Sequence, residues 1–66
     1  MNYIEIGGVL RNLDNMTKVE CRDAHDFNPT YYQIVFYYNK ESETVTYDSK
    51  KERDADWKML KTKLNI

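Results

Sequence analysis

The sequence has few of the cysteine and histidine residues that stabilise small domains through disulfides or bound metal ions. It contains one cysteine, Cys21, so no disulfide can form within the chain, and with one histidine it has too few ligands for a structural zinc site. Only two glycines and one proline occur, a composition that argues against a disordered chain. We therefore expect a folded domain that depends on its hydrophobic core.

The chain also lacks long apolar runs and a strong charge of either sign. Its most apolar stretch, residues 31–38, is too short to cross a bilayer, and the N-terminal residues MNYIEIGG have no features of a secretory signal. Ten basic residues face eleven acidic ones, whereas a dedicated nucleic-acid binder is usually basic. An unpaired cysteine without an export signal predicts a cytoplasmic protein that does not bind membranes.

The length of 66 residues predicts a single domain, residues 1–66. A domain of this size buries only about 60% of the surface that its unfolded chain exposes. No disulfide or metal site compensates for the small core. We therefore expect a homodimer as one state, in which a second copy completes the core.

The C-terminal part predicts a helix from about Lys50 to Leu64. Ser49 and Glu52 have the spacing of a capping box, in which the serine hydroxyl accepts the N–H of the third helical residue. The acidic residues come early and the lysines come late, which opposes the helix macrodipole. One side of this helix is a stripe at positions with helical spacing: Arg53, Trp57, Leu60 and Leu64.

The preceding residues predict strands. Residues 31–38, YYQIVFYY, are rich in aromatic and β-branched types, and the polar residues 39–43 form a loop that leads to an alternating strand at 44–47. Residues 16–23 and 3–10 also alternate, with Gly7-Gly8 indicating a bend or bulge and Asp14-Asn15 a turn. An alternative interpretation makes residues 9–16 a short helical turn. Residues 23–30, which contain Asn28-Pro29, are expected to form a loop.

These elements predict an α+β fold: a four-stranded antiparallel sheet followed by one C-terminal helix packed on one sheet face. A shift of one residue would exchange the two faces, because strand side chains alternate. The expected core face consists of Ile4, Ile6, Leu10, Val19, Cys21, Tyr32, Ile34, Phe36, Tyr38, Val45 and Tyr47.

The opposite face is the most informative surface, because one helix covers only one face of a sheet. Tyrosine supplies a large rigid contact area with one polar tip and is enriched at interface centres. Tyrosine and threonine are also ordinary strand formers. The alternative is therefore that they occur on this face because they favour strands and not because they bind a partner. The predicted partner-binding residues are Tyr3, Arg22, Tyr31, Gln33, Val35 and Tyr37.

The sequence offers no residue set that could support catalysis. The compact cluster of reactive types is Cys21, Asp23, His25 and Asp26, in which Cys21 is expected to point into the core and His25 to lie in a loop. No phosphate-binding glycine motif occurs. We therefore expect neither an enzyme nor a catalytic site, metal site or cofactor.

Two resemblances add to this interpretation. The order of four strands and a helix that carries Trp57 resembles the transcriptional-coactivator type of single-strand-binding domain, which dimerises and holds nucleic acid on its sheets. The basic strand residues of that family are represented here only by Arg11, Lys18 and Arg22, so no functional residue is carried over. Residues 31–64, YYQIVFYYNKESETVTYDSKKERDADWKMLKTKL, resemble small open reading frames of Firmicutes phages. That resemblance implies a short accessory protein that inhibits or redirects a host factor.

The sequence thus predicts a phage or mobile-element accessory protein that acts in the host cytoplasm. It would bind a host protein or defence complex stoichiometrically through its tyrosine-bearing sheet face. The alternative is a single-stranded nucleic-acid-binding protein that stacks bases on Tyr3, Tyr31 and Tyr37.

Overall fold

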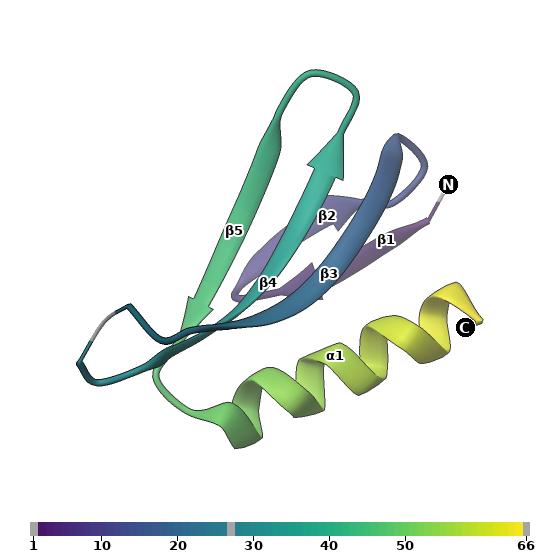
Figure 1. The fold of residues 1–66 in the computed structure, drawn as a ribbon. Coiled ribbons are helices and arrows are strands. Elements are labelled where there is room, and N and C mark those ends of the chain that lie inside the picture. Colours follow the sequence, from purple (N-terminus) through teal and green to yellow (C-terminus); the bar gives the residue numbers. More distant parts are fainter. Residues whose placement is uncertain (1, 27, 66) are drawn as a thin grey trace.

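The computed structural model describes residues 2–26 and 28–65, so Phe27, within the predicted loop 23–30, lies outside the described residues. Its elements, all antiparallel where they pair, are β1 Tyr3–Ile6, β2 Val9–Asn12, β3 Met16–Ala24, β4 Tyr31–Tyr38, β5 Ser42–Tyr47 and α1 Lys50–Leu64 (Figure 1). The α+β class with one C-terminal helix is confirmed. The single four-stranded sheet is wrong, because the strands form a two-stranded sheet, β1-β2, and a three-stranded sheet, β3-β4-β5, called here the main sheet.

The extra strand arises at Gly7 and Gly8. Both have positive φ, +63° and +78°, as the central residues of a tight two-residue hairpin turn require. The chain therefore reverses at once and pairs Ile6 with Val9, where the sequence predicted one strand with a bend. The alternative of a helical turn at residues 9–16 is wrong as well, since residues 9–12 are extended and 16 begins β3.

The β1-β2 hairpin and α1 cover the same face of the main sheet. In Figure 1 the hairpin lies behind the main sheet and the helix runs alongside both. Ile4 and Ile6 from β1 and Leu60 from α1 pack with Ile34 and Phe36 of β4. The buried cluster is Ile4, Ile6, Leu13, Ile34, Phe36, Val45, Tyr47 and Leu60. The predicted core face of the main sheet is therefore confirmed, with Val19, Tyr32 and Tyr38 packed at its border.

Leu10 is the error in the predicted core, because this residue is 67% exposed. The tight turn restarts the alternation of side chains, so Leu10 pairs with Glu5 on the outward side of the hairpin. Arg11, opposite Ile4, takes the inward place instead, where it lies over the Phe36 ring and forms an ion pair with Glu43. Leu13, which the alternation did not place, is buried.

The helix has the predicted bounds, Lys50–Leu64. The Ser49 hydroxyl accepts the backbone N–H of Glu52 at 3.4 Å, and the left-handed Asn65 ends the helix by donating its N–H to the last carbonyls. Arg53 and Leu60 are buried, and Trp57 and Leu64 pack against the core. The predicted stripe is thus the side of α1 that faces the sheets.

Candidate binding surface

The face of the main sheet that points away from the hairpin and the helix is the candidate site. The registers of β3-β4 and β4-β5 place its side chains in three rows that cross all three strands. We call this surface the open face and define it by these rows: Lys18, Tyr37 and Ser42; Glu20, Val35 and Thr44; Arg22, Gln33 and Thr46. The regular register sets nine side chains on one lattice.

One row is joined by hydrogen bonds from edge to edge. The Nε of Arg22 donates to Oε1 of Gln33 at 3.0 Å. The Nε2 of Gln33 donates in turn to the Thr46 hydroxyl at 3.4 Å. Gln33 therefore holds side chains from β3 and β5, and the row presents a polar strip whose geometry is already set.

The opposite end of the open face contains a compact charge cluster. The Tyr37 hydroxyl donates to a carboxylate oxygen of Glu20, while the Lys18 ammonium lies 4.7 Å from the centroid of the Tyr37 ring. Lys18 also approaches the other Glu20 oxygen at 3.7 Å. The hydrogen bond between Tyr37 and Glu20 lowers the pKa of Glu20 and raises the pKa of Tyr37. The charges of this cluster are therefore balanced within the molecule.

Val35 stands at the centre of the open face and is only 3% exposed. It is not part of the main buried cluster, because its side chain points to the other side of the sheet from Ile34 and Phe36. Its neighbours across the strands are Glu20 and Thr44, so polar side chains surround an apolar centre. Val35 therefore orders the surface and offers little area of its own to a partner.

The two remaining predicted contact residues lie farther out. Tyr31 is half-buried at the start of β4, opposite Ala24, at the margin of the open face. Tyr3 is 39% exposed on β1 and pairs with Asn12, on the outward side of the hairpin. The structure thus brings Arg22, Gln33, Val35 and Tyr37 together, with Tyr31 beside them, and leaves Tyr3 on a different sheet.

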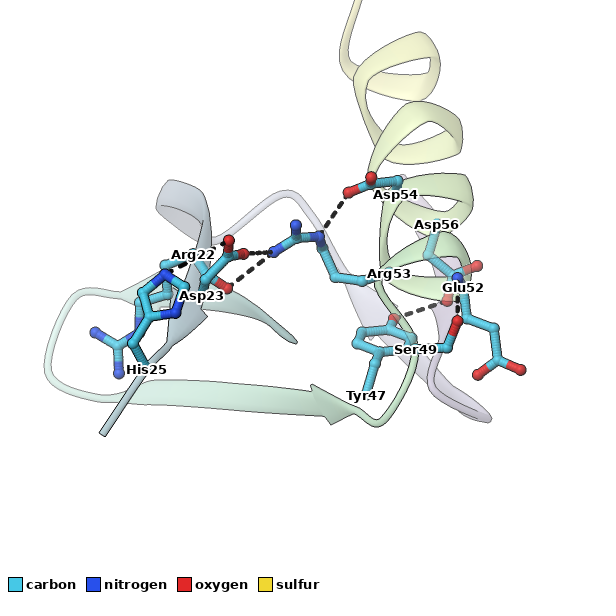
Figure 2. A network of polar contacts seen from close by, with 9 residues as sticks. All are labelled: Arg22, Asp23, His25, Tyr47, Ser49, Glu52, Arg53, Asp54 and Asp56. Carbon is cyan, nitrogen blue, oxygen red and sulfur yellow. Dashed lines mark hydrogen bonds and ion pairs between the residues drawn. The ribbon is translucent and has the colours of Figure 1, made fainter. Parts of the chain in front are cut away.

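A second polar cluster ties the helix to β3, and sequence reasoning missed it. Arg53 on α1 is 3% exposed, and its guanidinium points at the end of β3 (Figure 2). One nitrogen, Nη1, donates to the Arg22 carbonyl and to the Asp23 carboxylate, each at 2.9 Å. The Nε donates to Asp54 at 2.7 Å, and the guanidinium lies over the Tyr32 ring.

These contacts explain how the charged Arg53 side chain can be buried between α1 and the main sheet. Burial lowers the pKa of Arg53, but the hydrogen bonds to Asp54 and Asp23 outweigh it, so the pKa is raised overall. The sequence prediction placed Arg53 on the helical stripe by its spacing and assigned no partner to its guanidinium. The signal that could have revealed the cluster is a guanidinium on the buried stripe of a helix, because a buried charge requires partners.

Two of the four residues of the predicted reactive cluster, Cys21 and Asp23, have structural contacts. Cys21 is half-buried beside Ile34 on the covered side of the main sheet, and burial raises the pKa of its thiol. His25 lies 3.9 Å from Asp23, whose carboxylate already accepts from Arg53 (Figure 2). Among residues 2–26 and 28–65, no group of three or more histidine, cysteine or acidic side chains is placed to hold a metal ion.

A polar cavity of about 520 Å³ adjoins the open face at the end of β3. It shares Arg22 and Gln33 with the open face, so the hydrogen-bonded pair of these two side chains forms one of its walls. The other lining residues are Asp23, Ala24, His25 and Asp26. A partner that lies across the open face could therefore insert a polar group at this end.

Comparisons with protein-family models, curated proteins and solved structures found no match for this chain. Among the residues that the structure describes, no helix has the length and apolar character needed to span a membrane.

Proposed function

We propose that this protein is a non-enzymatic binding module and that the open face of the main sheet is its contact surface. The observation that carries the proposal is the difference in covering. The hairpin and the helix both lie on one face, whereas the other face presents a lattice of ordered polar side chains. Because neither the hairpin nor the helix covers this face in the described structure, it is the face of the main sheet that remains accessible to a partner.

The hydrogen bonds within the open face support binding with little loss of side-chain freedom. Long side chains such as those of Arg22 and Gln33 normally lose conformational entropy when a partner fixes them. Here their mutual hydrogen bond already restricts them before any partner arrives. Arginine and tyrosine are also the residue types that most often dominate interface energies, and both stand on this face.

A protein is the partner class that the surface favours. The Lys18 ammonium lies on the ring of Tyr37, where a stacked base would have to lie, and the Glu20 carboxylate beside it would repel phosphate. Tyr3, the third proposed stacking residue, is on the other sheet. The resemblance of residues 31–64 to short phage proteins makes a host protein or defence complex in the host cytoplasm the first partner to test, with inhibition or redirection as the effect.

The test is affinity capture from a host lysate with matched variants. Arg22→Ala/Gln33→Ala removes the central strip of the open face, while Lys58→Ala/Lys61→Ala changes exposed lysines on α1 and serves as the control. We expect one host protein to be captured by the wild type and the control and lost with the face variant. Calorimetry with that purified protein should then give a fixed stoichiometry. Equal capture by both variants would refute the open face as the contact surface.

The nucleic-acid alternative is tested directly by fluorescence anisotropy with labelled single-stranded DNA and RNA at low salt. We expect no binding. Binding that weakens steeply with salt and disappears in Tyr31→Ala/Tyr37→Ala would replace the protein-binding proposal with base stacking.

A further inference from the structure

The main sheet has two edge strands, β3 and β5, and they differ in their protection against pairing with another strand. The β3 edge has a register shift between Met16 and Lys18, and charged side chains follow along the strand. In addition, Arg53 reaches over from α1 to the carbonyl of Arg22. Bulges, charges and covering groups are the devices by which proteins prevent edge-to-edge association.

The β5 edge has neither a bulge nor a covering group in the described structure. Its register with β4 is regular, and its open-face side chains are the uncharged Ser42, Thr44 and Thr46. Its one charged residue, Glu43, points to the covered side and pairs with Arg11. Figure 1 shows β5 at the border of the main sheet, with β4 on one side and no element of the drawn chain along its outer side.

The hydrogen-bonding phase of β5 follows from its hairpin with β4. The N–H of Tyr38 donates to the carbonyl of Glu41 at 2.8 Å, which makes these residues a hydrogen-bonded pair. Such pairs alternate with non-hydrogen-bonded pairs along an antiparallel ladder. Residues 43, 45 and 47 therefore bond to β4, and Ser42, Thr44 and Thr46 turn their N–H and C=O groups outward.

We propose that β5 is a dimer interface, where it pairs antiparallel with β5 of a second copy about a two-fold axis at Thr44. In this register Thr44 lies opposite its own copy, and Ser42 lies opposite Thr46, so all three outward residues find partners. Paired hydroxyl-bearing residues on neighbouring strands stabilise a sheet, whereas like charges directly opposite destabilise it. Glu43 falls opposite Val45, so no like charges lie directly opposite each other, and each Glu43 is already paired with Arg11 of its own copy.

A second copy of this chain is the partner that best fits the β5 edge. The outward residues carry hydroxyl groups at all three positions, and the strand is therefore self-complementary when it is reversed. The product is a continuous sheet in which the two open faces lie side by side. A domain of this size also gains proportionally more than a larger one from association. The proposal does not depend on the proposed function, because it concerns the edge of the sheet.

The decisive experiment is sedimentation equilibrium from micromolar to millimolar protein, with the full chain. We expect the wild-type mass to rise from 8.0 kDa toward twice that value. Thr44→Pro removes an outward N–H that the fold does not use, so it should keep the mass at 8.0 kDa throughout. Thr44→Val retains the N–H and the shape and loses only one hydroxyl pair, so it should still dimerise, with an affinity reduced several-fold at most.

A second variant guards against misfolding in Thr44→Pro. Thr44→Lys places like charges opposite each other on the two-fold axis and should also remain at 8.0 kDa with an unchanged far-UV spectrum. Hydrogen exchange of the wild type should show slower exchange at the amides of residues 42, 44 and 46 as concentration rises. A wild type that stays at 8.0 kDa overturns the proposal, as does a dimer that persists in Thr44→Lys.

Discussion

The two faces of the main sheet both bury residues of β4, but they do so by different means. On the covered face, Ile34 and Phe36 are fully buried because the hairpin and the helix lie on them. On the open face, Val35 is 3% exposed because polar side chains of its own sheet surround it. One face therefore obtains its order from tertiary packing and the other from register, so substitutions should affect the two faces differently.

Phe36→Ala should give the largest effect, since it opens a cavity on the covered face. We expect a loss of about 3–5 kcal/mol in the free energy of unfolding, enough to unfold much of a domain this small. Val35→Ala, a smaller truncation on the open face, removes two methyl groups and should cost about 1.5 kcal/mol. Urea denaturation monitored by Trp57 fluorescence measures both. Equal losses in the free energy of unfolding would show that the two faces are stabilised in the same way.

Gly7→Ala should lift the hairpin from the covered face. A Cβ at Gly7 would lie 2.8 Å from Cγ1 of Val45 and would also have to adopt a positive φ. Strain and overpacking together should cost about 2–3 kcal/mol. Gly8→Ala meets no atom within 4 Å and carries only the conformational strain, so about 1 kcal/mol is expected.

The difference between these two glycine variants can be checked by thermal unfolding. Because the contact with Val45 is specific to Gly7, adding Val45→Ala should reduce the cost of Gly7→Ala relative to the Val45→Ala background. If Gly7→Ala and Gly8→Ala lower the unfolding temperature equally, Gly7 does not pack against Val45 of β5 as described.

Arg53→Ala should weaken the link between α1 and β3. Removing one partner of a buried ion pair costs about 3–5 kcal/mol, but the Asp23 and Asp54 side chains are 31% and 50% exposed, so water can replace part of the loss. We expect a loss of about 2 kcal/mol, and a partial loss for Arg53→Lys, which keeps the charge without the planar fork. Lys58→Ala on the exposed side of α1 is the control and should leave the unfolding temperature unchanged.

Tyr37→Phe should have the smallest effect on stability and a clear effect on titration. It removes the hydrogen bond that lowers the pKa of Glu20, so this pKa should rise toward its ordinary value in a carboxyl-detected NMR titration. A lowered folded-state pKa stabilises the fold above the unfolded-state pKa, and this contribution is lost as pH falls through the folded-state value. The wild-type advantage over Tyr37→Phe should therefore vanish in acid. An unchanged Glu20 titration in the variant would contradict the hydrogen bond.

Local sequence signals were sufficient for part of the fold. The helix bounds followed from the cap at Ser49 and the stripe through Leu60, because these features act within one or two helical turns. Strand β4 and the side of the sheet that the helix covers followed from the alternation of Ile34 and Phe36 with Val35. The mutual hydrogen bonds of the open face depend on register, which the alternation alone did not supply.

The parts that failed depend on contacts between distant residues. A Gly-Gly pair is compatible with a bulge and with a tight turn, and here Gly7 forms the turn against Val45, which is remote in sequence. That choice reversed the side on which Leu10 lies and moved Tyr3 away from the open face. Likewise, Arg53 finds Asp23 across 30 positions of the chain, a separation that no local pattern records.

The close contact between Gly7 and Val45 also has an evolutionary consequence. Every amino acid other than glycine brings a Cβ into that contact, so relatives that keep this fold should retain glycine at position 7 or change it only together with a smaller residue at position 45. Position 8, which has space around it, can accept asparagine or aspartate at positive φ. Paired inheritance of positions 7 and 45 is therefore a signature by which diverged homologues of this protein can be recognised.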